Sequence, residues 1–170
     1  MLKPLVEKRP RLRLRPLVPG QPEFTVGWEH LAAVAREAAP LLAREHAEVA
    51  SDSRLKFDPD WNRLLSWDAA GALDIWTLRA GAMLIGYASV LFIPHLYSRQ
   101  VKMANVHTPY LMPEWRAGWR GIEMLKVLFE ALKECGVQVI DMDLDKDSRL
   151  HGVLDRMGFE APETRRRKWL

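Results

Sequence analysis

"PEWRAGWRGIEMLK", residues 113–126, decides how the chain folds, because it places two arginines and two glycines directly before an apolar pattern with helical spacing. The first turn of a helix has backbone N–H groups without intrahelical partners, and it is the positive end of the helix dipole. Glycines let the backbone approach a bound group closely, and arginines add positive charge. Arg116, Gly118, Arg120 and Gly121 therefore predict an anion site, of the kind that holds a phosphate, where a strand meets a helix.

The segments after this stretch alternate between helix and strand. Ile122, Leu125, Leu128 and Leu132 recur at helical spacing, and Gly136 is a typical helix stop. We predict a helix over residues 119–134, a buried strand over 137–144, a helix over 148–157 and a final strand over 159–169.

The segments before the stretch include mainly antiparallel strands. In residues 11–15 arginine and leucine alternate, which predicts a half-buried first strand with Leu12 and Leu14 facing inward. Residues 18–24, "VPGQPEF", break this strand. The other predicted elements are one or two helices over 28–49, kinked or split by Pro40; a short helix capped by Asp58 that ends by Gly71; a hairpin of strands 73–79 and 83–93; and a strand over 102–112.

This order predicts a mixed α/β fold, with a mostly antiparallel central sheet flanked by helices. With 170 residues, of which 48% are hydrophobic, the chain can form one well-packed domain. We place that domain at residues 11–170, after a basic N-terminal tail at residues 1–10. The chain has a net charge of +3. Its two basic ends, residues 1–16 and 165–168, have net charges of +5 and +4, so the remaining residues together have a net charge of −6. Such ends could contact nucleic acid, although short basic termini are more often simply solvated.

The sequence also excludes several classes of protein. A single cysteine, Cys135, allows no internal disulfide and fits a reducing compartment. The longest apolar run, residues 83–94, is shorter than the roughly 20 residues of a membrane helix, and no apolar signal core follows the basic N-terminus. We expect a cytoplasmic protein without membrane insertion. Alternating aspartates in "DMDLDKD", residues 141–147, lack the glycine turn and terminal glutamate of a calcium loop, so no metal site is predicted.

The order of elements and two local motifs resemble the GNAT (Gcn5-related N-acetyltransferase) superfamily. The segments "PHLYSRQ", "YLMPEWRAGWRGIEMLK" and "LDRMGFE" are similar in sequence to GNAT-like proteins of tailed phages and prophages. The resemblance covers residues 11–170 and is strongest from residue 83 onward. It implies a GNAT fold and an acyltransferase that uses acetyl-CoA.

The resemblance also assigns the cofactor site. In that superfamily a strand leads into an R/Q-x-x-G-x-G/A loop that cradles the pyrophosphate of acetyl-CoA, and Arg116 and Gly121 stand at matching places, while Trp119 occupies the first glycine position. We expect the Trp119 side chain to swing outward and the backbone of the strand end to pair with the pantetheine. The predicted cofactor-binding residues are Leu111, Met112, Arg116, Ala117, Gly118, Trp119, Arg120 and Gly121.

The second motif, "VLDRMGFE", is similar to the GNAT ending in which a helix admits the cofactor. Gly158 and Phe159 match, but Leu154 stands where a tyrosine commonly protonates the departing thiolate. A thiol of ordinary pKa, about 8.5, is a tolerable leaving group near neutral pH, so the loss of a general acid weakens catalysis without abolishing it.

Acyl transfer to an amine requires a base, because only the uncharged amine can attack. The predicted catalytic residues are His107, on the strand that leads into the loop, and His46 and Glu48, on the first helical segment. Glu45 beside His46, and His95 with Tyr97, are further candidates. For each histidine, a half-buried hydrogen-bonding role remains the alternative.

From these residues we expect transfer of an acetyl group from acetyl-CoA to a primary amine by direct attack. Two alternatives stay open: a GNAT-shaped binding or regulatory protein that has lost turnover, and a phage transferase that modifies nucleobases. The sequence does not identify the acceptor, a small molecule or a protein, nor the oligomeric state.

Overall fold

The computed structural model describes residues 12–14, 22–49, 54–144, 148–161 and 168. Its centre is a six-stranded sheet in the order β1-β2-β3-β4-β5-β6. All neighbouring strands pair antiparallel except β5 and β6, which are parallel. The strands are β1 (Leu12–Leu14), β2 (Phe24–Glu29), β3 (Leu73–Ala80), β4 (Met83–Pro94), β5 (Lys102–Leu111) and β6 (Val139–Asp143).

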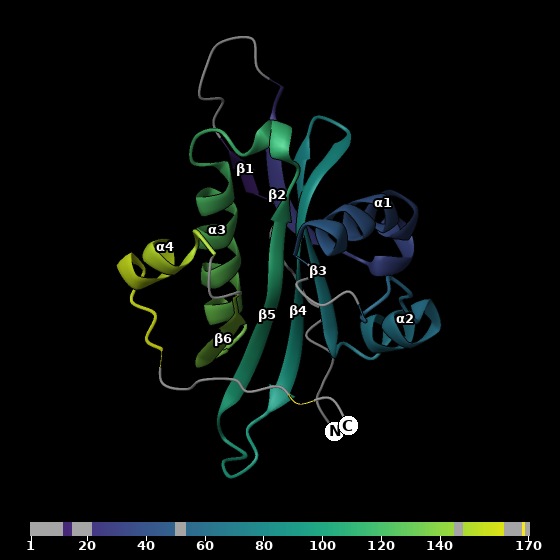
Figure 1. Cartoon of the computed structure of the whole chain (residues 1–170). Helices are drawn as coiled ribbons and strands as arrows, with labels where there is room; N and C mark the ends of the chain where they lie inside the picture. The colour runs from purple at the N-terminus through teal and green to yellow at the C-terminus, as the bar shows by residue number, and fades with distance from the viewer. Residues whose placement is uncertain (1–11, 15–21, 50–53, 145–147, 162–167, 169–170) are drawn as a thin grey trace.

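Helices cover both faces of the sheet and give the molecule three layers (Figure 1). On one face lie α1 (Leu31–Val49) and α2 (Trp61–Ala69), and on the other lie α3 (Arg120–Glu134) and α4 (His151–Arg156). The larger core, between the sheet and α3, includes Val106, Met124 and Leu128, all almost fully buried. Ala38 and Leu41 of α1 pack on Tyr87 and Tyr110 on the opposite face. Within the described residues, no helix is long and apolar enough to cross a membrane.

The central and C-terminal elements confirm most of the predicted order. The hairpin of β3 and β4, the strand β5 and the helix α3 each lie within a few residues of their predicted bounds. The helix predicted over 148–157 is shorter, and α4 covers only His151–Arg156. The result is the predicted mixed α/β fold with a mostly antiparallel sheet.

The N-terminal part differs from the prediction in two ways. Residues 24–29 form strand β2, although the prediction placed a break up to residue 24 and a helix from residue 28. Pairing with β1 and β3 on both sides explains the strand, because it satisfies the backbone of a segment whose Phe24 and Val26 are buried. Pro40 does not split the following segment, since α1 is one helix from Leu31 to Val49. The packing of Ala38 and Leu41 on either side of Pro40 offsets the hydrogen bond that the proline removes.

Three smaller predictions are wrong. Leu12 is 44% exposed, because β1 is a three-residue strand at the edge of the described sheet, and of its two leucines only Leu14 packs against the core. The cap of α2 is Asp60, whose side chain accepts a hydrogen bond from the Arg63 N–H at 3.0 Å, whereas Asp58 was predicted. Strand β6 is not buried as expected: it is the last strand of the described sheet, and Val139 is 38% exposed.

The predicted final strand over 159–169 lies mostly outside the described residues. Residues 159–161 are not in a strand. The ring of Phe159 instead lies 5.3 Å from that of Phe129 on α3, measured between centroids.

Candidate active site

The parallel pairing of β5 and β6 stops halfway along β5. The last pair is His107 with Asp143, and β5 continues to Leu111 without a partner residue on β6. Among the described strands, the sheet therefore splits after His107, and one edge of the end of β5 has no neighbouring strand. A strand edge of this kind offers backbone N–H and C=O groups to an extended ligand.

An irregularity in β5 coincides with this split. Tyr87 pairs with Tyr110 and Ser89 with His107, so β5 has one residue more than β4 over this stretch. The extra residue makes a β-bulge. The bulged segment includes Pro109, which has no N–H to donate to the hydrogen bonds between strands. The bulge reverses which face later residues occupy: Val106 packs on the α3 side, and Tyr110 packs on the α1 side.

The chain leaves β5 through a short 3-10 helix, η1 (Pro113–Trp115), and reaches α3 through an exposed loop. Gly118 has φ +83°, a conformation that favours glycine, and the side chain of Trp119 is 64% exposed, pointing outward as predicted. The side chain of Trp119, the N-cap residue of α3, makes no capping hydrogen bond. Among the described residues, a Cβ added at Gly121 would meet only the Leu111 Cδ2, at 3.8 Å, so these residues leave open space beside the backbone at the start of the helix.

Both ends of this loop are fixed on Phe24 of β2. Trp115 contacts the Phe24 ring edge-on, with 5.7 Å between centroids, and the Arg120 guanidinium lies 4.0 Å above the centre of the same ring. Arg120 is only 3% exposed and pairs with Glu123 at 2.9 Å. In the structure the Arg120 side chain thus lies in the core, and not on the surface where direct phosphate contact was expected.

Arg116 points the other way, toward α1. Its Nε donates to the Leu111 carbonyl at 2.7 Å, and its Nη2 donates to Glu48. Its guanidinium carbon lies 5.4 Å from the centre of the Tyr110 ring, and the Tyr110 hydroxyl donates to Glu48 at 3.0 Å. One carboxylate thus joins the first helix, the bulge and the loop.

These contacts change the acidity of both groups that Arg116 approaches. Burial would raise the pKa of Glu48, but the hydrogen bonds from Arg116 and Tyr110 outweigh it, so the pKa lies below its ordinary value. Desolvation, and then the hydrogen bond to Glu48, raises the pKa of Tyr110. Glu48 is therefore an anion and Tyr110 a neutral donor near neutral pH.

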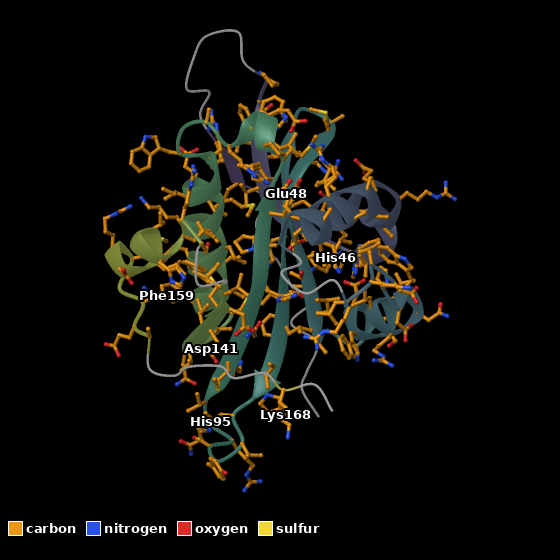
Figure 2. The ribbon with its side chains drawn as sticks, in the orientation of Figure 1. His46, Glu48, His95, Asp141, Phe159 and Lys168 are labelled. Atoms are coloured by element: carbon orange, nitrogen blue, oxygen red, sulfur yellow. The ribbon has the colours of Figure 1, made fainter. Side chains whose placement is uncertain are left out.

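The structure separates the histidine candidates. His107 is exposed at the split, and strand alternation places it on the face opposite Val106, the same side of the sheet as α1. His46 packs near the Phe57 ring, with 5.6 Å between centroids. His95 lies at the tip of the β4–β5 hairpin, at the far end of these strands from Glu48 (Figure 2). Of the predicted bases, the geometry brings His107 and Glu48 to the region of the split.

Two other predictions can be located. Both backbone groups of Met112 are bonded within the protein, the N–H to the Ile85 carbonyl at 2.9 Å and the carbonyl to the Trp115 N–H at 2.8 Å. Leu154 is 5% exposed and packs inside, and its apolar side chain can donate no proton. Within the described residues, no group of three or more histidine, cysteine or acidic side chains could hold a metal.

Sequence reasoning missed the tyrosines of this region. Tyr110 reaches Glu48 only because of the bulge, and nothing in a single sequence marks that bulge except Pro109. Tyr87, beside it on β4, is 2% exposed, and among the described residues its hydroxyl has no hydrogen-bond partner.

The sheet order, the split after His107 and the loop into α3 define a GNAT-like fold. An aminoglycoside acetyltransferase from an uncultured soil metagenomic sample has this fold, with TM-score 0.68 and 13% identity over 86% of this chain and 96% of that one. A ribosomal-protein-alanine N-acetyltransferase from Brucella melitensis is similar at TM-score 0.67 and 16% identity, over 86% and 99% of the two chains. Glucosamine-6-phosphate N-acetyltransferase from Arabidopsis thaliana is similar at TM-score 0.63 and 13% identity, over 86% and 97%. No protein-family model and no curated protein sequence matches the chain.

Proposed function

We propose that this protein is an N-acyltransferase that moves an acetyl group from acetyl-CoA to a primary amine. The observation that carries the proposal is the split of β5 from β6 after His107, followed along the chain by a loop into α3, whose N-cap residue makes no side-chain capping hydrogen bond. An extended pantetheine suits the first and a pyrophosphate suits the second. The fold shared with three acetyltransferases, two of which are N-acetyltransferases, supports the same class of reaction.

On the donor side, the loop of residues 116–119 and the start of α3 would hold the pyrophosphate. Gly121 leaves room for a phosphate beside the helix backbone, and Arg116 supplies the exposed positive charge. Met112 is already bonded on both its backbone groups, and the Leu111 carbonyl accepts from Arg116 Nε, so the pantetheine edge is best assigned to the part of β5 between His107 and these groups. Trp119, which is largely exposed, would cover the bound cofactor.

On the acceptor side, the face toward α1 would receive the amine. Acetyl-CoA supplies an activated acyl group: a bond forms between the amine nitrogen and the acetyl carbon, and the carbon–sulfur bond breaks with its electron pair going to sulfur. His107 would accept the proton that the amine loses, since it is exposed at the split and on this face. With Leu154 buried, the thiolate leaves without a proton from that position.

The test is an acetyl-transfer assay with a panel of amines chosen from the neighbours. The aminoglycoside enzyme has been crystallised with sisomicin, so the panel contains sisomicin, a peptide with an N-terminal alanine, and glucosamine-6-phosphate. We expect CoA thiol release with at least one amine, and an acetylated product in the mass spectrum. CoA binding without any transfer would instead favour the binding or regulatory alternative. Nucleic-acid contact through the basic ends, the cytoplasmic location and the likeness to phage proteins stay predictions.

A further inference from the structure

The proposed donor site and the observed ion pair make different use of the Arg116 side chain. Arg116 is the first residue of the loop to which we assign the donor pyrophosphate, yet its guanidinium lies against α1 and is paired with Glu48. The Arg116 Nε also donates a hydrogen bond to the Leu111 carbonyl, which holds this side chain at the end of β5. The guanidinium is therefore held between the donor loop and the acceptor face.

The exposure of the two loop arginines shows which of them can move. The Arg120 side chain is 3% exposed and lies over Phe24, so moving it would open the core. The Arg116 side chain is 46% exposed, and its partner Glu48 is 35% exposed. An ion pair this exposed is worth little, about 0.2–1 kcal/mol, so a stronger anion can replace the carboxylate.

A pyrophosphate is such an anion. It carries at least two negative charges, and the planar guanidinium matches phosphate oxygens with paired hydrogen bonds. Glu48 offers a single carboxylate that is already shared with the Tyr110 hydroxyl. Competition between the two anions for Arg116 follows from these charges, provided that the loop binds the donor.

We propose that Arg116 exchanges Glu48 for the donor pyrophosphate, so that donor binding opens the Glu48 carboxylate to the ammonium group of the acceptor. This inference rests on the proposed function and deepens it. Arg116 shows what the vacated position accepts, because it places a cation against a carboxylate and near a tyrosine ring, at 5.4 Å from the ring centre. An alkylammonium ion has the same charge and can use the same two groups. The acceptor class is accordingly a cationic primary amine, and the donor binds first.

The experiment measures CoA affinity by titration calorimetry in wild type, Glu48→Gln, Arg116→Met and the double variant. If Glu48 competes with the pyrophosphate, Glu48→Gln tightens CoA binding, by about 1.5- to 5-fold for a pair of this exposure. The tightening should vanish in the Arg116→Met background, because the exchange then has no cation. Glu114→Gln is the matched control: it removes the same charge from η1, where Glu114 pairs with Arg44 at 3.2 Å, and should tighten CoA binding less.

The direction in which Glu48→Gln changes CoA affinity shows whether Glu48 competes with the pyrophosphate for Arg116 or only holds Arg116 in place. If Glu48 only holds Arg116 in place for the phosphate, Glu48→Gln weakens CoA binding, and the proposal is overturned. Equal tightening with and without Arg116, or no change, overturns it as well. Absence of CoA binding in wild type is a different result, since it removes the proposed function itself. A melting scan of each variant establishes that it is folded before it is titrated.

Discussion

Replacing Gly121 by glutamate tests the anion site at the start of α3. The backbone there does not need glycine for its own conformation: Gly121 is not among the glycines with positive φ, and of the described residues an added Cβ would meet only Leu111, at ordinary contact distance. A helix interior prefers almost any residue to glycine, and an acidic side chain in the first turn favours the helix dipole by about 0.3–1 kcal/mol. Gly121→Glu should therefore fold with an unchanged or slightly higher melting temperature.

The same carboxylate should prevent donor binding. Two unit charges about 4 Å apart repel by roughly 1 kcal/mol in water and roughly 4 kcal/mol near a protein surface. With at least two charges on the pyrophosphate, the loss is at least about 2 kcal/mol, or about thirty-fold in Kd. Titration calorimetry with CoA measures it directly, and Gly121→Ala should lose much less.

Gly152→Glu is the control, because it adds the same group on an exposed residue of α4 with no positive φ. Gly71 would be a poor control, since its φ of 70° would strain any side chain. If Gly121→Glu is folded and binds CoA as tightly as Gly152→Glu and wild type, the phosphate does not lie at the start of α3, and this assignment of the loop is refuted.

Two further predictions concern acidity and catalysis. The pKa of Glu37 is lowered, chiefly by its hydrogen bond from Arg79, so its contribution to stability is present above its ordinary pKa and is lost as the pH falls through the lowered value. Acid should therefore reduce the free energy of unfolding more in wild type than in Glu37→Gln, and equal slopes in urea melts between about pH 5 and pH 3 would contradict this. His107→Ala should lower kcat by about 10²–10⁴-fold while CoA affinity stays the same. Loss of CoA affinity, or an unchanged kcat, would show that His107 is not the base.

The fold was predictable where local pattern and tertiary packing agree. Helix α3 shows this best, because its apolar spacing and its stop at Gly136 are visible in the chain, and the structure buries that stripe. Strand β2 was not predictable, because its proline- and glycine-rich approach indicates a break and only pairing with β1 and β3 makes it a strand. The predicted kink or split at Pro40 was wrong for a related reason, because packing outweighed the effect of a local helix breaker.

The candidate site divides in the same way. The loop from Arg116 to Gly121 is continuous in sequence, so its glycines and its helix start could be recognised from the motif alone. The pair of Glu48 and Arg116 joins positions 68 residues apart, and no spacing rule reaches that far. The side of the sheet on which Tyr110 lies could not be predicted either, because one extra residue in β5 reverses the alternation of side chains along the strand. Arg120 was assigned to the phosphate for its charge, and only the structure shows it buried over Phe24.

The most direct test of the central claim is whether acetyl-CoA binds and stabilises the fold. At a hundred times its dissociation constant, a ligand that binds only the folded protein adds about 2.7 kcal/mol to the free energy of unfolding. A melting scan of the full chain with acetyl-CoA, and with CoA alone, should show a clear upward shift. No shift with acetyl-CoA or with longer acyl-CoAs, together with no CoA in the mass spectrum of the purified protein, would contradict the assignment of this fold to acyl transfer.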